Sequence, residues 1–283
     1  QCALEGPLRT AGRRNALHAG GLLFYRDAMK NGMRFRVSAA ILTVVMVLSC
    51  AVAARAATSQ GTVSVLVYHS FLGDKPFPSD ISIQELKAQL DDLKAQGYRF
   101  VTLSDIVAGA VQGSKNILVS IDDGNQSVYQ AYHEVFKPRG IKPLLCIYPN
   151  IIGKKAYALS WERLSELAQA GCDIAAHGFY HYPLNQKAYD TDPKSFCKEI
   201  FHSKEVLETR LNKKVMAFAY PNGVNAPITK RIVQEAGYTC AFTVLWGPVR
   251  SPVESNPDRF ALGRYMIYKN NWDMIRNTII KVR

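Results

Sequence analysis

From Thr62 onward, strand-like and helix-like segments alternate along the chain, and this alternation constrains the fold more than any other feature. The β-branched, apolar run "TVSVLVYHS" (residues 62–70) precedes "SIQELKAQLDDLKAQG" (residues 82–97), whose leucines have helical spacing. In the second segment, Ser82 is a candidate N-cap and Gly97 a stop signal. Because such units recur about seven times, we expect a parallel sheet with right-handed crossovers. The predicted fold is a single-domain α/β structure, a distorted (β/α)7-type barrel.

The other expected elements follow the same alternation. We expect further strands at residues 98–103, 116–122, 142–149, 172–177, 215–221, 239–244 and 260–267, and further helices at residues 104–113, 127–140, 160–171, 193–211, 228–237 and 272–280. The sequence contains no glycine-rich phosphate-binding fingerprint, which disfavours an open nucleotide-binding sheet.

Residues 33–57 have the composition of a secretory signal. After Met33 come two arginines, then an apolar run over residues 37–54, and then the small-residue pattern Ala-Arg-Ala. This order predicts export to the periplasm or the extracellular space, with an uncleaved membrane anchor through residues 37–54 as the alternative. Residues 1–32 show no clear periodicity, so we expect the folded domain to comprise residues 58–283.

The charge of the chain does not indicate nucleic-acid binding. The formal net charge is +12, but residues 1–57 contain eight basic and two acidic residues and so account for half of it. The remainder is mildly basic without a lysine or arginine block, which excludes a nucleic-acid footprint. We expect membrane contact only through an uncleaved signal segment, and no obligate protein partner.

Four cysteines lie beyond the signal segment: Cys146, Cys172, Cys197 and Cys240. None forms a Cys-x-x-Cys pair, which disfavours a cysteine zinc site. In an exported protein they allow three disulfide pairings, and buried thiols explain them equally well.

Polar residues follow several of the expected strands. Asp122 and Asp123 in "SIDDGN" end one buried strand, where Asp-Gly is also an ordinary turn dipeptide. His69, His177 and the segment 220–222 end three others. Because active sites of such barrels gather at the carboxyl ends of the strands, we expect these residues to converge on one rim.

"HGFYH" places His177 and His181 four residues apart. The pair can be two ordinary loop histidines. Together with a carboxylate from another strand, it forms a two-histidine, one-aspartate set with open coordination positions, which suits a catalytic divalent metal such as zinc. One of the two aspartates can then bind the metal while its neighbour takes a proton.

"SIDDG", "HGFYH" and "FAYPNG", in this order, resemble the first three motifs of the polysaccharide deacetylases, carbohydrate esterase family 4, whose fold is the NodB homology domain. The stretches "VLVYHSF", "ELKAQLDDLKAQGYRFVTLSDI" and "AGYTCAFTV" are similar to the bacterial branch that includes the poly-N-acetylglucosamine deacetylases. The resemblance covers about residues 62–268.

The resemblance implies a role for each matched residue. Asp122 would be the general base, and Asp123, His177 and His181 the metal ligands. The backbone N–H of Asn222, after the third-motif proline, would help to hold the oxyanion. The implied reaction is the hydrolysis of an acetamido group, which releases acetate and leaves a free amine.

The sequence also departs from the family pattern. Ala219 stands where many members have an arginine that steadies the catalytic aspartate, and Asn222 stands where a tyrosine is common. The late histidine that acts as general acid is not evident. We therefore predict that His69 is the acid, with a hydrogen-bonded strand-end histidine as the alternative. Arg264 is the candidate to steady Asp122, with a surface arginine as the alternative.

The sequence thus predicts an exported, zinc-dependent N-deacetylase that acts on a polysaccharide containing N-acetylglucosamine. The alternatives are a deacetylase of peptidoglycan, of a chitin-like polymer or of an O-acetylated glycan. A further alternative, from another class, is a non-catalytic glycan-binding relative that keeps the barrel.

Overall fold

The computed structural model describes residues 61–75 and 77–281, which belong to one compact unit. The expected signal segment and the extension before it, residues 1–57, lie outside the described residues. No helix within the described ranges is both long enough and apolar enough to cross a membrane.

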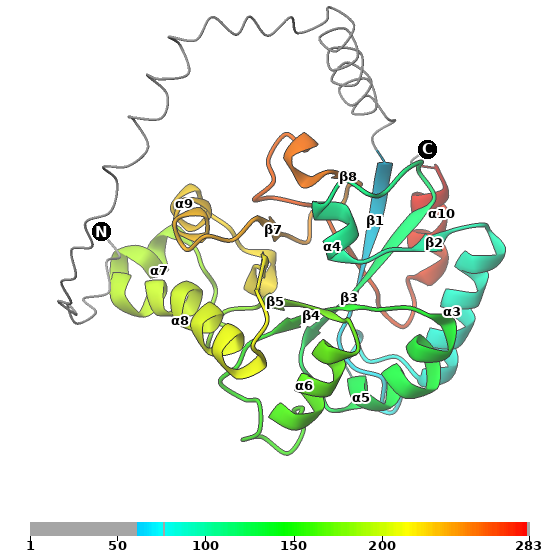
Figure 1. The fold of residues 1–283 in the computed structure, drawn as a ribbon, viewed down its shortest axis with the longest axis horizontal. Helices are drawn as coiled ribbons and strands as arrows, with labels where there is room; N and C mark the ends of the chain where they lie inside the picture. Colours follow the sequence, from blue (N-terminus) through cyan, green and yellow to red (C-terminus); the bar gives the residue numbers. More distant parts are fainter. Residues whose placement is uncertain (1–60, 76, 282–283) are drawn as a thin grey trace, which may run out of the picture. The chain divides into compact units, whose positions relative to one another are not determined.

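A nine-stranded sheet forms the centre of this unit (Figure 1). Its strands are β1 (Gly61–Tyr68), β2 (Arg99–Phe100), β3 (Asn116–Asp123), β4 (Leu144–Ile147), β5 (Asp173–Ala176), β6 (Ala217–Ala219), β7 (Cys240–Phe242), β8 (Val249–Ser251) and β9 (Tyr265–Met266). The main path runs β7-β6-β5-β4-β3-β1-β8, while β2 pairs with β3 and β9 pairs with β1. Every pair is parallel except β1 with β8.

The sheet curls back on itself. A parallel bridge between Phe242 and Leu262 joins the end of β7 to the segment before β9, and β9 pairs with β1, which lies near the opposite end of the strand order from β7. This geometry confirms the α/β barrel-type fold predicted from the alternation of strands and helices. It also places the carboxyl ends of the parallel strands at one edge.

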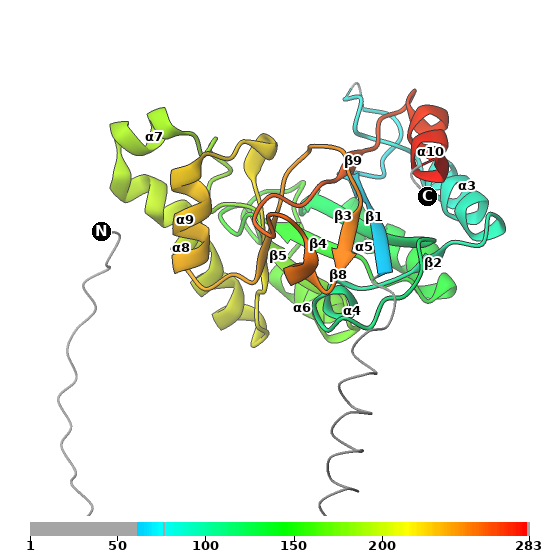
Figure 2. The same ribbon diagram turned by 90° about the horizontal axis from the view of Figure 1, so that it is seen from above.

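Helices cover the sheet and connect its strands. They are α3 (Ile83–Ala95), α4 (Leu103–Val107), α5 (Ser127–Ala131), α6 (Trp161–Gln169), α7 (Gln186–Thr191), α8 (Pro193–Leu211), α9 (Pro227–Glu235) and α10 (Trp272–Lys281). Ser82 caps α3 through a reciprocal bond with Glu85, as its sequence predicts. Figures 1 and 2 show α7, α8 and α9 grouped together, with α10 beside α3.

The two faces of β3 have different surroundings. Ile117, Val119 and Ile121 belong to the larger apolar cluster, which includes buried residues of α3, α6 and α8. Leu118 lies in a smaller cluster with mostly small residues of the neighbouring strands, such as Cys146 and Ala175. Because successive side chains of a strand alternate, Ser120 and Asp122 share the face of Leu118. Small neighbours on that face leave room for a large polar side chain.

Some elements differ from the sequence prediction. The expected strand at 260–267 is reduced to β9, and the expected helix at 127–140 continues beyond α5 as short π and 3-10 segments (Tyr132–Phe136 and Lys137–Arg139). Pro138, which has no backbone N–H, contributes to that irregular ending. The structure adds α7 and β8, which the sequence pattern did not predict.

The cysteines that the structure resolves as thiols are buried. Cys146, Cys172 and Cys240 are free, so no disulfide joins any two of these three. Burial raises the pKa of each thiol, which keeps it protonated and unreactive.

Candidate active site

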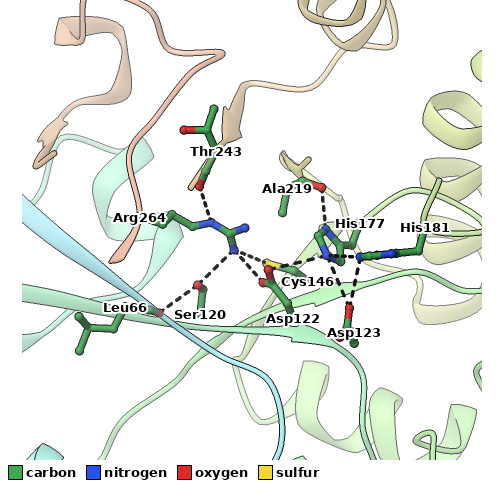
Figure 3. Close-up of polar contacts among 10 residues, drawn as sticks. All are labelled: Leu66, Ser120, Asp122, Asp123, Cys146, His177, His181, Ala219, Thr243 and Arg264. Atoms are coloured by element: carbon green, nitrogen blue, oxygen red, sulfur yellow. Dashed lines mark hydrogen bonds and ion pairs between the residues drawn. The ribbon is translucent and has the colours of Figure 1, made fainter. Parts of the chain in front are cut away.

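The carboxyl ends of β3 and β5 bring carboxylates and imidazoles together. Asp122 and Asp123 are the last two residues of β3, and His177 directly follows β5. Since β4 lies between these strands and His177 N–H donates to the carbonyl of Ile147 at 2.9 Å, the histidine is held at the level of the aspartates. Figure 3 shows both aspartates and both histidines converging at this edge.

Asp123, His177 and His181 form a candidate metal site. Each offers one ligand atom, and these atoms lie within 4.8 Å of one another. The Nε2 atoms of the two histidines are 3.1 Å apart, and each is 3.6 Å from Oδ1 of Asp123 (Figure 3). Two imidazoles and one carboxylate are the ligand set of many catalytic zinc sites, in which further positions stay open for water and substrate.

The hydrogen bonds of His177 suit a metal ligand. Its Nδ1 lies 2.7 Å from the carbonyl oxygen of Ala219, so the proton sits on Nδ1 and the Nε2 lone pair points toward Asp123 and His181. Burial lowers the pKa of His177, which favours the neutral imidazole that a metal requires. The side chains that are present therefore fit a divalent cation.

The backbone is strained at two of the three candidate ligands. Asp123 has φ 75° and His181 has φ 68°, in the left-handed region that non-glycine residues rarely adopt. Such conformations raise the free energy of the folded state by about 1–3 kcal/mol each. Strain of this kind persists only where the surrounding contacts hold it, and it is concentrated at functional sites.

Asp122 binds an arginine and is not one of the three candidate ligands. Its Oδ1 accepts a hydrogen bond from Nη1 of Arg264 at 2.7 Å, while its Oδ2 lies 3.7 Å from Nε2 of His177. Burial alone would raise the pKa of Asp122, but the charge of Arg264 holds that pKa well below its usual value. Asp122 is therefore an ionised carboxylate beside the candidate metal site.

Arg264 is fully buried and fixed on several sides. Its Nε donates to the carbonyl of Thr243 at 3.0 Å, and its Nη1 lies 3.4 Å from Oγ of Ser120 (Figure 3). Directly before β9, it enters the face of the sheet that β3 lines with Ser120 and Asp122. The structure thus places Arg264 beside the aspartate, while Ala219 contributes only its carbonyl, to His177.

His69 and Asn222, the other two predicted site residues, are less closely joined to this cluster. His69 follows β1, and its buried Nδ1 has no hydrogen-bond partner among the described residues. Asn222 is exposed in the turn Pro221–Gly223 after β6, with φ 56°. Within residues 61–75 and 77–281, no hydrogen bond or ion pair links its side chain to the aspartates.

The sequence prediction missed several residues that support the site. Ser120 and Thr243 contact Arg264, Tyr148 places its ring 5.2 Å from that of His181, and Glu199 binds the loop that bears His181. One signal was available for Glu199: it lies on the apolar stripe of α8, between Phe196 and Ile200, where a charged residue needs an explanation.

Comparison with known proteins identifies the domain that carries this site. The family model for polysaccharide deacetylases matches residues 110–241, a range that contains both aspartates and both histidines. The chain contains a polysaccharide deacetylase domain. IcaB from Ammonifex degensii has a similar structure, with a TM-score of 0.68 and 27% identity over 78% of this chain and 98% of that one. The Streptococcus pyogenes deacetylase PplD, solved with acetate, shares the fold with a TM-score of 0.65 and 21% identity, covering 77% of this chain and 98% of PplD.

Two curated deacetylases match a shorter part of this chain than the solved structures do. YxkH of Bacillus subtilis, which carries the name of a polysaccharide deacetylase, is 26% identical over 183 residues, and the match spans 63% of this chain and 63% of YxkH. The poly-β-1,6-N-acetyl-D-glucosamine N-deacetylase of Staphylococcus epidermidis is 23% identical over 207 residues, 69% of this chain and 70% of that protein.

Proposed function

We propose that this chain hydrolyses N-acetyl groups of a polysaccharide that contains N-acetylglucosamine, and so releases acetate and leaves amines on the polymer. The observation that carries the proposal is that the two adjacent aspartates have different partners. Asp122 binds Arg264, whereas Asp123 faces His177 and His181. In this proposal a base lies beside a cation site, the arrangement that metal-dependent amide hydrolysis uses. The match to the polysaccharide deacetylase model and the name of the Staphylococcus relative support this reaction class.

Asp123, His177 and His181 would hold the metal, for which we propose zinc. When bound there, the cation would lower the pKa of a water molecule toward neutrality and polarise the acetyl carbonyl. Asp122 is the general base in this proposal. Because Arg264 occupies its Oδ1, its Oδ2 remains to accept the proton of the attacking water.

Two further residues complete the proposed reaction. As water oxygen bonds to the carbonyl carbon, negative charge develops on the carbonyl oxygen, and the backbone N–H of Asn222 donates to it from the turn after β6. The C–N bond then breaks, and the departing nitrogen takes a proton, which we assign to His69. The products are acetate and a free amine.

We also propose that the enzyme acts outside the cytoplasm. Residues 33–57 have the pattern of a secretory signal, and a polymeric glycan is a substrate that an exported enzyme can reach. In this proposal residues 58–283 are the catalytic domain and residues 1–32 are not part of it. An uncleaved anchor at residues 37–54 would keep the domain at the membrane surface.

Mass spectrometry of acetylated glucosamine oligomers tests the proposed reaction. Incubation with the zinc-loaded protein should remove acetyl groups from nitrogen, with free amines appearing in proportion to acetate. A matched O-acetylated oligomer without N-acetyl groups should remain unchanged. Loss of acetyl groups only from the second substrate would favour an O-deacetylase, and no change in either would favour a glycan-binding relative.

Replacing Arg264 by alanine should lower kcat by about 10-fold to 1,000-fold, the range for disturbing a general base. Without the guanidinium, the buried Asp122 loses the charge that lowers its pKa, so its pKa rises. The acidic limb of the pH–rate profile should therefore move to higher pH, while the metal content stays the same. Arg259→Ala is the matched control, because Arg259 is half-exposed and pairs with Glu254.

The rate and the metal content of Arg264→Ala need to be measured on folded protein, because removal of one partner of a buried ion pair destabilises a fold. A folded variant with the wild-type rate and an unmoved acidic limb would show that Asp122 is steadied by other groups.

A further inference from the structure

Glu199 is a buried carboxylate that has no positively charged partner among the described residues. It lies on α8 with 1% of its surface exposed, and no lysine, arginine or histidine within residues 61–75 and 77–281 forms an ion pair with it. A buried, unpaired charge is strongly disfavoured unless hydrogen bonds replace the lost water. The groups that stabilise this carboxylate therefore indicate why it is there.

Those groups are backbone N–H groups of the loop that carries His181. Phe179 N–H donates to Oε2 at 2.9 Å, Tyr180 N–H to Oε1 at 2.9 Å, and Tyr182 N–H to Oε2 at 3.3 Å. Hydrogen bonds to an ionised acceptor are stronger than those between neutral groups. Glu199 thus binds the chain on both sides of a candidate metal ligand.

The loop has a conformation that needs such support. His181 has φ 68°, which is unfavourable for a residue with a side chain. Gly178 has φ 76°, and a Cβ atom there would lie 2.6 Å from Oε2 of Glu199. The carboxylate and the glycine therefore fit each other closely between His177 and His181.

We propose that Glu199 is a positioning residue of the metal site: it fixes the loop from Phe179 to Tyr182 so that the imidazole of His181 lies beside the other two ligands. This inference rests on the metal site in the proposed function. Glu199 touches no reacting group in this proposal. It acts on the metal through the backbone of its ligand, as outer-shell partners of metal ligands do.

Titration of metal-free protein with Co²⁺ tests this role without any measurement of activity. The visible absorption of bound Co²⁺ reports both its affinity and the geometry of its ligands. Glu199→Gln keeps the size of the side chain but removes its charge and turns one acceptor into a donor. We expect its Co²⁺ dissociation constant to rise about 10-fold to 100-fold, the usual effect of an outer-shell change, and its absorption spectrum to change.

Glu208→Gln is the matched control. Glu208 also lies on α8, and its Oε1 accepts the backbone N–H of Val215 at 2.9 Å, but that loop carries no metal ligand. This variant should bind Co²⁺ with the wild-type affinity and spectrum, even if its unfolding temperature falls. A wild-type affinity and spectrum for Glu199→Gln would overturn the inference.

Two further variants complete the test. Glu199→Asp keeps the charge but retracts it by one methylene, so it should also weaken Co²⁺ binding and serves if Glu199→Gln does not fold. If neither folds without metal, Glu199 is a general folding determinant and the inference is wrong. Equal Co²⁺ affinity of the wild type and His181→Ala would instead refute the proposed metal site itself, and the role of Glu199 with it.

Discussion

Replacing Asp122 by asparagine should remove most of the turnover and leave the metal in place. The amide has nearly the shape of the carboxylate but cannot take the proton of water, and a general base contributes about 10²-fold to 10⁴-fold to a rate. Asp122 is 2% exposed and bound to Arg264, so the substitution changes the chemistry of this position more than its packing. The measurement is kcat on an N-acetylated glucosamine oligomer, together with zinc content by elemental analysis.

Asp123→Asn is the natural comparison for Asp122→Asn, because it changes the neighbouring residue in the same way. Asp123 lies 3.6 Å from Nε2 of both histidines, so this variant should lose metal affinity as well as rate. Equal loss of metal in both variants would show that the two aspartates do not have the separate roles of general base and metal ligand.

Replacing His177 or His181 by alanine should abolish the stoichiometric metal and the activity together. Only three protein ligands converge at this site within the described part of the chain, so removal of one leaves two. Ligand count and geometry set metal affinity, and two ligands hold zinc poorly. Elemental analysis of the purified variants, with turnover measured on the same samples, checks this prediction.

A histidine away from the cluster provides the control for these variants. His133 lies beside Tyr129 and 3.2 Å from Glu166, so His133→Ala should keep both metal and activity. Full metal content in either His177→Ala or His181→Ala would remove those residues from the ligand set.

The sequence predicts helices and strands correctly where several local signals indicate the same element. Ser82 and Gly97 bracket α3, and the apolar runs of β1 and β3 are long enough to identify as strands. The signals fail for β8, which has three residues and an exposed arginine at its centre, because its place is set by antiparallel pairing with β1. Such pairing depends on residues distant in sequence, which periodicity cannot reveal.

Part of the candidate site could also be predicted from the sequence. Parallel strands carry the residues that follow them to one edge, so the meeting of Asp122, Asp123 and His177 could be expected from the order of elements. The contact between Arg264 and Asp122 joins residues 142 positions apart. The expected strand through Arg264 suggested that this residue reaches the rim, but its burial beside Ser120 depends on the curl of the sheet.

The contacts of Glu199 could not be predicted from the sequence pattern. Its position on the apolar stripe of α8 marks it as buried, but nothing in the sequence names its partners. Those partners are main-chain groups of a loop, and they become visible only when α8 is packed beneath that loop.

The most direct test is the release of acetate from an N-acetylated glucosamine oligomer before metal removal, after removal by a chelator, and after return of zinc. The proposed function predicts that the loaded protein contains one metal per chain and releases acetate with an equal number of free amines. Release should stop in the metal-free protein and resume with zinc. Unchanged release from protein shown to be metal-free, or no release from the fully loaded protein, would contradict a metal-dependent deacetylase at Asp122, Asp123, His177 and His181.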